Sequence, residues 1–341
     1  MARGVTRDAW LLARALRDPE QTRALDSTGW TALIAMARAE QMIGTLAHRL
    51  NGLPMPGAVA AILADAMASA AQGRIAALWE AEMARRALAL LGCPVVLLKG
   101  TAFVAAGLGA GVGRSIGDLD ILLPRDALCA GEAALLAAGW EWVKPDAYDD
   151  AYYRQWMHEL PPLIHRDRDR MIDVHHTILP LTAQITPDAP ALIAASVPLG
   201  NGLHVLAPAD MLVHAAAHLF ADGDLAGGMR NLWDIHCLVD EFGTAGLWAR
   251  AAHHGLARHM GRAMRLAHHL YGTDVPGDCR ALAGADALYL RRLLARDGWG
   301  RAVRPVVRMG FYIRSHALRM PPAMLARHLW TKWRKGQGHT G

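Results

Sequence analysis

The sequence predicts an α/β (α+β) protein in which a small mixed sheet is flanked by N-terminal and C-terminal helical regions. Three observations predict this class. Residues 8–91 place apolar side chains at helical spacing throughout. From about residue 94 to 200, short leucine-rich and β-branched runs end at glycine or proline, which is typical of buried strands. Helical spacing returns after about residue 205. The regions we expect are 1–92, 93–204 and 205–341.

The individual elements are predicted from the same patterns. A helix is expected to begin near residue 27, with Ser27 or Thr28 as its cap, and to stop at Asn51-Gly52. A charged turn at 167–170 separates the two strands of a hairpin. The other predicted elements of the central region are strands at 94–100, 118–124 and 140–143, helices at 101–111 and 125–139, and the hairpin at 161–178.

Composition narrows the class of protein further. Hydrophobic residues make up 53% and aromatic residues only 6%, which favours a helix-rich globular protein over a β-sandwich. The longest apolar run, residues 87–98, has 12 residues, whereas a membrane-spanning helix needs about 20. The first residues lack the uninterrupted apolar stretch of a signal peptide. We therefore expect a cytoplasmic protein without a membrane-spanning helix.

Cysteine spacing and charge distribution add two expectations. The four cysteines have no C-x-x-C spacing, so we expect small buried thiols and neither disulfides nor a zinc site. They are Cys93, Cys129, Cys237 and Cys279. Residues 301–341 carry nine Lys/Arg and no acid, which leaves 27 basic and 31 acidic residues elsewhere. This acid-free C-terminus could contact nucleic acid, a membrane surface or an acidic peptide, and residues 324–336 have an apolar face suited to an interface. Such runs are more often solvated, and we favour none of these partners.

The stretch "GRSIGDLDILLP" at 113–124 is the first sign of chemistry. In a strand, Asp118 and Asp120 share one face and lie about 6.6 Å apart, because alternate side chains point the same way. The leucine and isoleucine residues between and after them then point into a core. Two neighbouring carboxylates repel each other unless a cation or solvent lies between them. The pattern therefore predicts a metal site.

Two further segments of the central region complete this pattern. A predicted strand ends in Lys99-Gly100-Thr101, where a glycine allows backbone amides to approach phosphates and a hydroxyl can donate to them. A later strand carries Asp173 between apolar neighbours. Carboxylates are suited to Mg²⁺, which usually completes its coordination shell with substrate phosphates. A third carboxylate can share a metal that lowers the pKa of an attacking hydroxyl.

These segments resemble the DNA polymerase β-like nucleotidyltransferase superfamily. More closely, "LLKG", "GRSIGDLDILL" and "MIDVHHTI" look like a bacterial family of largely uncharacterised nucleotidyltransferases, over residues 95–178 and more loosely over the helices that follow. The resemblance implies a nucleotidyltransferase core with two Mg²⁺ ions, for which Mn²⁺ can substitute, and an NTP co-substrate, with ATP as the default. It implies Asp118, Asp120 and Asp173 as catalytic and metal-binding residues, and Gly100-Thr101 as a phosphate loop.

Several supporting residues have two interpretations each. Lys99 could contact a phosphate or be solvated. Arg114 could stabilise the triphosphate or pair with the nearby carboxylates. His175 shares a strand face with Asp173 and is expected to orient it, whereas His176 points the other way and is expected to be structural.

The predicted reaction is transfer of an NMP from an NTP to a hydroxyl of an unidentified acceptor, with release of pyrophosphate. The acceptor is a small molecule, a peptide or a protein, and we expect it to bind between the core and one helical region. A second hypothesis is a catalytically silent nucleotide-binding protein. A third comes from "RNLWDIH", in which Arg230 and His236 match the pattern of HEPN ribonucleases and would make this an RNA-cleaving or RNA-binding helical protein.

Two helical motifs can also be explained by a purely structural role. Arg230 and Asp234 lie at i and i+4, so we favour an ion pair that supports the helix and docks it to the core over an RNA-cleaving site. His214 and His218 are also at i and i+4 and could bind a metal, but their helix is rich in alanine. We favour interior histidines there.

Overall fold

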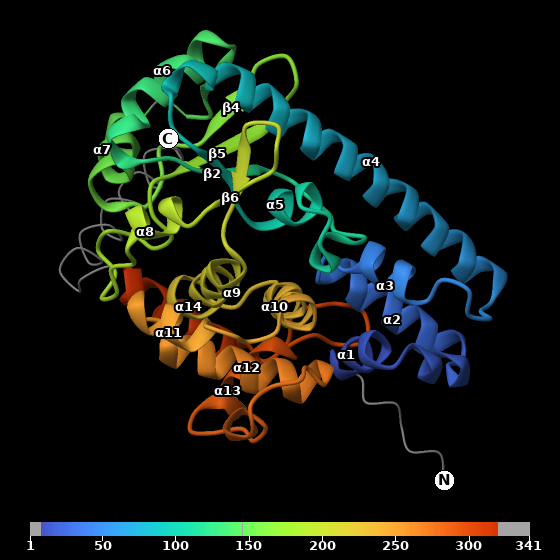
Figure 1. Ribbon diagram of the computed structural model, residues 1–341. Coiled ribbons are helices and arrows are strands. Elements are labelled where there is room, and N and C mark those ends of the chain that lie inside the picture. The colour runs from blue at the N-terminus through green and yellow to red at the C-terminus, as the bar shows by residue number, and fades with distance from the viewer. Residues whose placement is uncertain (1–7, 145, 320–341) are drawn as a thin grey trace, which may run out of the picture.

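A computed structural model of the chain describes residues 8–144 and 146–319. At its centre is a seven-stranded sheet in the order β3-β4-β5-β2-β1-β7-β6 (Figure 1). The pairs β2–β5 and β1–β7 are parallel, and the other neighbours are antiparallel, so the predicted mixed sheet is confirmed. The strands are β1 Val95–Leu97, β2 Leu119–Leu122, β3 Trp140–Trp142, β4 Leu163–His165, β5 Met171–His175, β6 Val197–Pro198 and β7 Leu203–Val205.

The five strands predicted from apolar runs are all present, and two short ones were missed. Leu119, Ile121 and Leu123 are buried, as the alternation around the two aspartates predicts. Strands β6 and β7 have two and three residues, too few for a period of two to be recognised. Because β7 pairs with β1 and ends at Val205, the sheet reaches across the predicted boundary at 204. The division into three regions stays a prediction.

Helices cover both ends of the chain, as predicted. The N-terminal helices are α1 Trp10–Arg17, α2 Ser27–Ala39, α3 Ile43–Arg49 and α4 Gly57–Ala87. Those of the central region are α5 Lys99–Ala105, α6 Leu128–Ala137, α7 Ala147–Trp156 and α8 Ala189–Ala194. The C-terminal helices are α9 Pro208–Ala217, α10 Gly228–Phe242, α11 Leu247–His253, α12 Ala257–Tyr271, α13 Asp286–Leu293 and α14 Pro305–Arg319, with a π-helical turn at His218–Asp222. The long helix α4 runs along one side of the molecule from α3 to the sheet (Figure 1).

The single helix expected from residue 27 to about 50 is wrong in two respects. The chain breaks it after α2, where Gln41 adopts the left-handed conformation with φ +55°. This turn buries Met42 and lets α3 pack on α4. The N-cap is Asp26, whose carboxylate accepts a hydrogen bond from Gly29 N at 2.7 Å, and neither Ser27 nor Thr28. Aspartate is as good a cap as serine.

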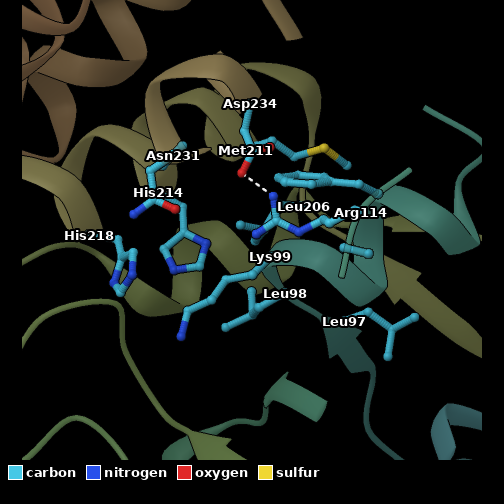
Figure 2. A pocket seen from close by; sticks show the side chains of 13 residues that line it. Leu97, Leu98, Lys99, Arg114, Leu206, Met211, His214, His218, Asn231 and Asp234 are labelled. Carbon is cyan, nitrogen blue, oxygen red and sulfur yellow. Dashed lines mark hydrogen bonds and ion pairs between the residues drawn. The ribbon is translucent and has the colours of Figure 1, made fainter. Parts of the chain in front are cut away.

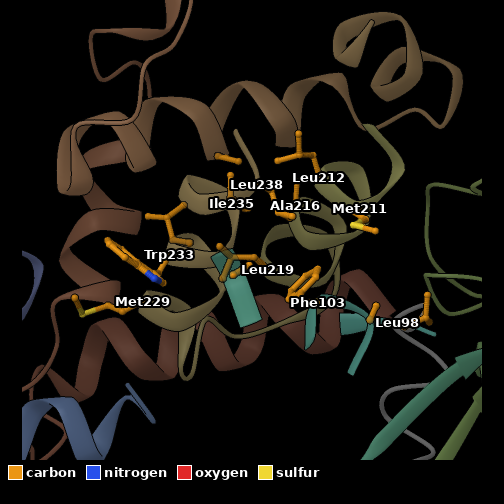
Figure 3. Close-up of a cluster of buried hydrophobic side chains, with 14 of the residues drawn as sticks. Leu98, Phe103, Met211, Leu212, Ala216, Leu219, Met229, Trp233, Ile235 and Leu238 are labelled. Carbon is orange, nitrogen blue, oxygen red and sulfur yellow. The ribbon is translucent and has the colours of Figure 1, made fainter. Parts of the chain in front are cut away.

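One apolar core joins the sheet to the C-terminal helices. Trp233, Ile235 and Leu238 of α10 pack with residues of α9 in a buried cluster that also contains Phe103 of α5 and Leu98 at the end of β1 (Figure 3). The end of β1 and the C-terminal helices therefore form a continuous interior, and the space between them is fixed by packing.

Three further expectations concern membrane-spanning helices, the cysteines and the basic C-terminal segment. No helix in the described ranges is long and apolar enough to cross a bilayer. All four cysteines are free, so the expectation of no disulfides is confirmed. Cys279 is buried and Cys93 and Cys237 are half-buried, but Cys129 is exposed, so the prediction of a buried thiol is wrong there. The basic segment 324–336 lies outside the described residues.

Candidate active site

The parallel pairing of β2 with β5 brings the predicted aspartates together. In this register Asp120 is the direct partner of Asp173, so the two side chains lie on one face of the sheet. Asp120 is buried, with 4% of its surface exposed. Asp118 precedes the first residue of β2 and is exposed. The site therefore has one carboxylate in the interior, one half-buried at Asp173 and one facing solvent.

Lys99 supplies a positive charge to the buried carboxylate. Its Nζ lies 2.6 Å from Asp120 Oδ1. Burial by itself lowers the pKa of Lys99, but the charge and hydrogen bond of Asp120, together with the charges of Asp118 and Glu159, outweigh this effect and raise the pKa above its ordinary value. The backbone of Lys99 has φ +48°, a conformation uncommon for a residue other than glycine and often found at functional sites. The interpretation of Lys99 as a merely solvated lysine is thus not what the structure shows.

His175 contacts the same carboxylate oxygen. Its Nε2 lies 3.0 Å from Asp120 Oδ1, and its Nδ1 lies 3.4 Å from Glu159 Oε2. The expectation that His175 orients Asp173 is therefore wrong, because its ring nitrogens face Asp120 and Glu159. Burial raises the pKa of Asp120, but Lys99 and His175 outweigh burial and hold it far below its usual range. His176 points away and its Nε2 lies 3.3 Å from Met157 O, which fits the structural role predicted for it.

Glu159 is a site residue that the sequence analysis missed. Residues 158–160 pair in antiparallel fashion with the end of β5, through His176 N to His158 O at 2.8 Å and Leu160 N to Val174 O at 2.9 Å. This pairing places Glu159 opposite His175. The two prolines that follow at 161–162 lack the amide protons of a regular strand, so the segment has the sequence pattern of a loop. No local spacing connects Glu159 with residues more than ten positions away.

Negative charge exceeds positive charge around Asp173. Burial, followed by the charges of Glu159, Asp120 and Asp118, raises the pKa of Asp173 to about 7. Four carboxylates thus surround one lysine, Lys99, and like charges at this density are what a bound cation stabilises. Because carboxylate oxygens are the ligands that Mg²⁺ prefers, the donor set fits a hard divalent cation.

The three aspartates are nevertheless not the tightest group of ligand atoms. Among the described residues, the group whose possible ligand atoms all lie within 4.8 Å of one another is His158, Glu159 and His175. Repulsion keeps like-charged aspartates apart, whereas an imidazole can approach a carboxylate closely. His214 is buried and His218 is half-buried, and the preference for interior histidines over a metal pair at that position stays a prediction.

Gly100 and Thr101 form the first turn of α5 beside Lys99. A Cβ atom at Gly100 would lie 2.5 Å from Arg114 Nε, so glycine is required for Arg114 to pack against this turn. Thr101 is only 1% exposed, and its hydroxyl has no hydrogen-bond partner in the part of the chain that the structure describes. The hydroxyl therefore does not face solvent in this conformation.

Arg114 is held by the C-terminal helices and not by the neighbouring aspartates. Its guanidinium donates to Asp234 Oδ2 on α10, and Arg230 donates to Oδ1 of the same carboxylate at 2.9 and 3.1 Å. Arg230 also donates to Thr45 of α3 and to Ala110 O at 3.3 Å. Of the two interpretations of Arg114, pairing with the nearby Asp118 and Asp120 is thus not observed. We call Arg114, Arg230 and Asp234 the arginine–aspartate cluster.

The same contacts decide between the interpretations of "RNLWDIH". The predicted ion pair between Arg230 and Asp234 is confirmed. Arg230 is 5% exposed and has all of these partners in the interior. His236 is bonded to Thr273, with 2.9 Å between Nδ1 and Oγ1. A catalytic Arg–His pair needs groups that reach RNA, and this arrangement does not offer them.

A cavity of about 80 Å³ lies next to Lys99, between α5 and the helices α9 and α10 (Figure 2). Its polar lining comes from Lys99, Arg114, His214, His218, Asn231 and Asp234. Burial, followed by the charge of Lys99, lowers the pKa of His218 to about 3, and burial also lowers that of His214 well below its usual value. Both histidines are therefore neutral at pH 7. The cavity is located where the sequence analysis expected an acceptor.

A larger and more apolar cavity of about 670 Å³ lies at the other end of β2, between Pro124, residues 176–181 and α8. None of the three aspartates lines it. Lys99 lines the smaller cavity, and the aspartates that it contacts line neither of the two.

Comparison with known proteins agrees with this geometry. The model of a family described as uncharacterised nucleotidyltransferases matches residues 26–272. The chain belongs to this family. The match includes the whole sheet and extends from α2 to the start of the loop after α12, so the nucleotidyltransferase family spans all three predicted regions. No curated protein matches the chain.

Proposed function

We propose that the chain is a Mg²⁺-dependent nucleotidyltransferase of the DNA polymerase β-like superfamily. It moves an NMP from an NTP to a hydroxyl group of an acceptor and releases pyrophosphate. The observation that carries the proposal is the register that places Asp120 beside Asp173, in a setting where carboxylates outnumber lysine. Membership of a nucleotidyltransferase family supports it. ATP is the default donor, and the cytoplasm is the proposed location.

In this proposal Asp118, Asp120 and Asp173 hold two Mg²⁺ ions, with Mn²⁺ as a substitute. When bound, the metal neutralises charge on the phosphates and lowers the pKa of the acceptor hydroxyl. The residues present contribute mainly by positioning and by charge. Because Lys99 and His175 both contact Oδ1 of Asp120, its carboxylate has a defined orientation before any substrate binds.

The nucleotide-binding residues are proposed to be Lys99, Gly100, Thr101 and Arg114. Lys99 is well placed to contact a phosphate, since its Nζ already lies beside Asp120 and 27% of its side chain is exposed. An incoming triphosphate would replace Asp120 as its partner. Arg114 stays on Asp234 and contributes positive charge from the cavity wall.

The acceptor is proposed to enter the cavity beside Lys99. Uncharged hydrogen-bonding groups, His214, His218 and Asn231, line it together with apolar side chains. Such a lining suits a neutral group that carries a hydroxyl, because a buried charge without a partner is costly there. The acceptor can be a small molecule or the tip of a peptide or protein side chain.

The direct test uses NTPs labelled at the α-phosphorus. The chain is incubated with Mg²⁺, each NTP, and fractions of small metabolites, peptides and proteins, and label transfer and pyrophosphate are measured. Transfer should fall roughly 100-fold or more in Asp120→Asn, as is typical when a group that stabilises transition-state charge is lost. The control Asp126→Asn removes an exposed carboxylate just beyond the other end of β2 and should keep full activity.

The other outcomes distinguish the alternatives. Mg²⁺-dependent binding of an NTP without pyrophosphate release for any acceptor would indicate a catalytically silent nucleotide-binding protein. RNA cleavage that survives Asp120→Asn and is lost in His236→Ala would indicate the HEPN-like function instead.

A further inference from the structure

The end of β5 carries a second set of metal-ligating groups beside the three aspartates. His158, Glu159 and His175 present possible ligand atoms that all lie within 4.8 Å of one another. Backbone pairing of residues 158–160 with 174–176 fixes these side chains, so they do not meet by chance rotation of surface chains. The two imidazole rings are stacked, with 5.1 Å between centroids and 27° between planes.

Two of the three spacings are close to those of a tetrahedral coordination shell. With metal–ligand distances of about 2.0–2.2 Å for imidazole and carboxylate, neighbouring ligand atoms lie about 3.3–3.6 Å apart. Glu159 Oε2 is 3.4 Å from His175 Nδ1 and 3.8 Å from His158 Nε2. Both distances exceed those of good hydrogen bonds between these groups. An ion between the three atoms would draw His158 closer to Glu159.

Asp120 provides the outer-shell partner that such a site usually has. An imidazole that donates its Nε2–H to Asp120 Oδ1, 3.0 Å away, presents the lone pair of Nδ1 toward Glu159. A carboxylate that fixes a histidine in this way sets the ring orientation and strengthens the ligand, and this arrangement is common around zinc. His175 is 3% exposed, so its orientation is fixed by the interior.

His158 is held in the interior beside the other two side chains. Only 12% of its side chain is exposed, and its Nε2 is the nitrogen that faces Glu159. Its Nδ1 is buried with no hydrogen-bond partner among the described residues. Because Nδ1 is the other ring nitrogen, the evidence for an ion is the spacing of the three possible ligand atoms.

We propose that His158, Glu159 and His175 form a binding site for one divalent transition-metal ion, with Zn²⁺ as the best match. Two imidazoles and one carboxylate are typical zinc ligands, whereas Mg²⁺ prefers oxygen donors. The site is separate from the aspartates that would hold Mg²⁺. The ion ties residues 158–160 to β5, and through His175 it fixes the orientation of Asp120. The fourth coordination position is left for water or a substrate group.

The test measures metal binding in the absence of nucleotide, so its result does not depend on the proposed transfer reaction. The full chain is stripped with a chelator and titrated with Zn²⁺ in competition with a chromophoric chelator. We expect one Zn²⁺ per chain that millimolar Mg²⁺ does not displace. Co²⁺ should bind at the same stoichiometry and give the strong visible absorption of a tetrahedral site.

The variants separate this site from the aspartates and from surface histidines. His158→Gln and Glu159→Gln, each of which removes one ligand, should weaken Zn²⁺ binding by roughly 100-fold or more, and two variants guard against one that fails to fold. Asp120→Asn should weaken it by about 10- to 100-fold, as outer-shell changes do. Asp118→Asn and the control His253→Gln, on the exposed face of α11, should bind like the wild type.

The proposal is overturned if the chain binds no Zn²⁺ at a stoichiometric level. It is also overturned if binding survives both His158→Gln and Glu159→Gln in folded protein. Loss of binding in Asp118→Asn with retention in His158→Gln would assign the ion to the aspartates instead.

Discussion

Two groups of charged side chains each contribute to the lining of the cavity beside Lys99, one through Arg114 and Asp234 and the other through Lys99, and they are built differently. In the arginine–aspartate cluster, Arg114 and Arg230 share both oxygens of Asp234, and Arg230 has further acceptors on α3 and at Ala110. Around Asp120, four carboxylates have Lys99 and the imidazole of His175 as their partners among the described residues. The first group has partners for its charges within the chain. The second has carboxylates in surplus.

This difference shows how structural and functional charges can be told apart. A buried charge with complete partners contributes to folding and loses stability when a partner is removed. A surplus of like charges lowers the stability of the folded chain and is found where the charges bind a ligand of opposite sign. The comparison therefore predicts opposite stability effects for removal of a carboxylate from the two groups.

The largest effect is expected at Asp234. Asp234→Ala leaves two buried guanidinium groups without their carboxylate, and breaking a buried pair in this way typically costs about 3–5 kcal/mol. Urea unfolding of the wild type and of Asp234→Ala measures the change in the free energy of unfolding. Asp240→Ala, an exposed aspartate on the same helix, should change stability by less than about 0.5 kcal/mol. If Asp234→Ala lost no more stability than this control, the arginine–aspartate cluster would not hold the helices to the core.

A comparable effect, on activity and not on stability, is expected at Asp118. Asp118→Asn should lower transfer by about 10²–10³-fold, because a charged group of the site is lost. Its unfolding free energy should stay within about 0.5 kcal/mol of the wild type, since the residue is exposed. A folded variant with full transfer activity would exclude Asp118 from the site.

A smaller effect of opposite sign is expected at Asp173. Without divalent metal, Asp173→Asn removes one of four clustered negative charges and should raise the free energy of unfolding by about 1–2 kcal/mol at pH 8, where Asp173 with its pKa of about 7 is charged. Chemical unfolding in the presence of a chelator measures it. A loss of stability would mean that the carboxylates are not in surplus, and it would contradict the proposed difference between the two groups of charges.

The pH dependence of stability tests whether His218, which lines the cavity, is buried and neutral. Burial lowers the pKa of His218 to about 3 in the folded chain, against about 6.5 when unfolded. The unfolded chain therefore binds the proton first, so this contribution is fully present above pH 6.5 and is lost as pH falls toward 3, by at most about 1.4 kcal/mol per pH unit. The stability difference between the wild type and His218→Gln, followed from pH 7 to pH 4, should shrink. A constant difference would contradict the buried, neutral histidine.

The smallest effect is expected at His236. His236→Ala loses one hydrogen bond to Thr273 and ring contacts with Trp233, at a cost of about 1 kcal/mol. Transfer activity should not change. Thermal unfolding and the transfer assay check both statements, and a loss of RNA cleavage in this variant alone would revive the RNA hypothesis.

The local sequence pattern was sufficient to predict much of this fold. Apolar runs predicted β1, β2 and β5, and the alternation around Asp118 and Asp120 identified the strand that carries the site. The pairing of Asp120 with Asp173 follows once both strands are accepted as neighbours in one sheet. These features depend on residues a few positions apart, which a sequence displays directly.

The rest depends on contacts between distant residues. Arg114 and Asp234 are separated by 120 positions, so nothing local indicated that Arg114 leaves the aspartates for α10. Glu159 reaches the site through pairing of an irregular segment before two prolines. The break at Gln41 is a tertiary effect, because helical spacing continues through it and the packing of α3 on α4 decides it.

The most direct test of the central claim is thermal unfolding of the chain with each NTP, with and without Mg²⁺. A ligand that binds only the folded state at 100 times its Kd stabilises it by about 2.7 kcal/mol. The account predicts a Mg²⁺-dependent stabilisation by one or more NTPs, retained in Asp126→Asn and lost in the double variant Asp118→Ala/Asp120→Ala. No stabilisation by any NTP, or stabilisation that survives in the double variant, would contradict it.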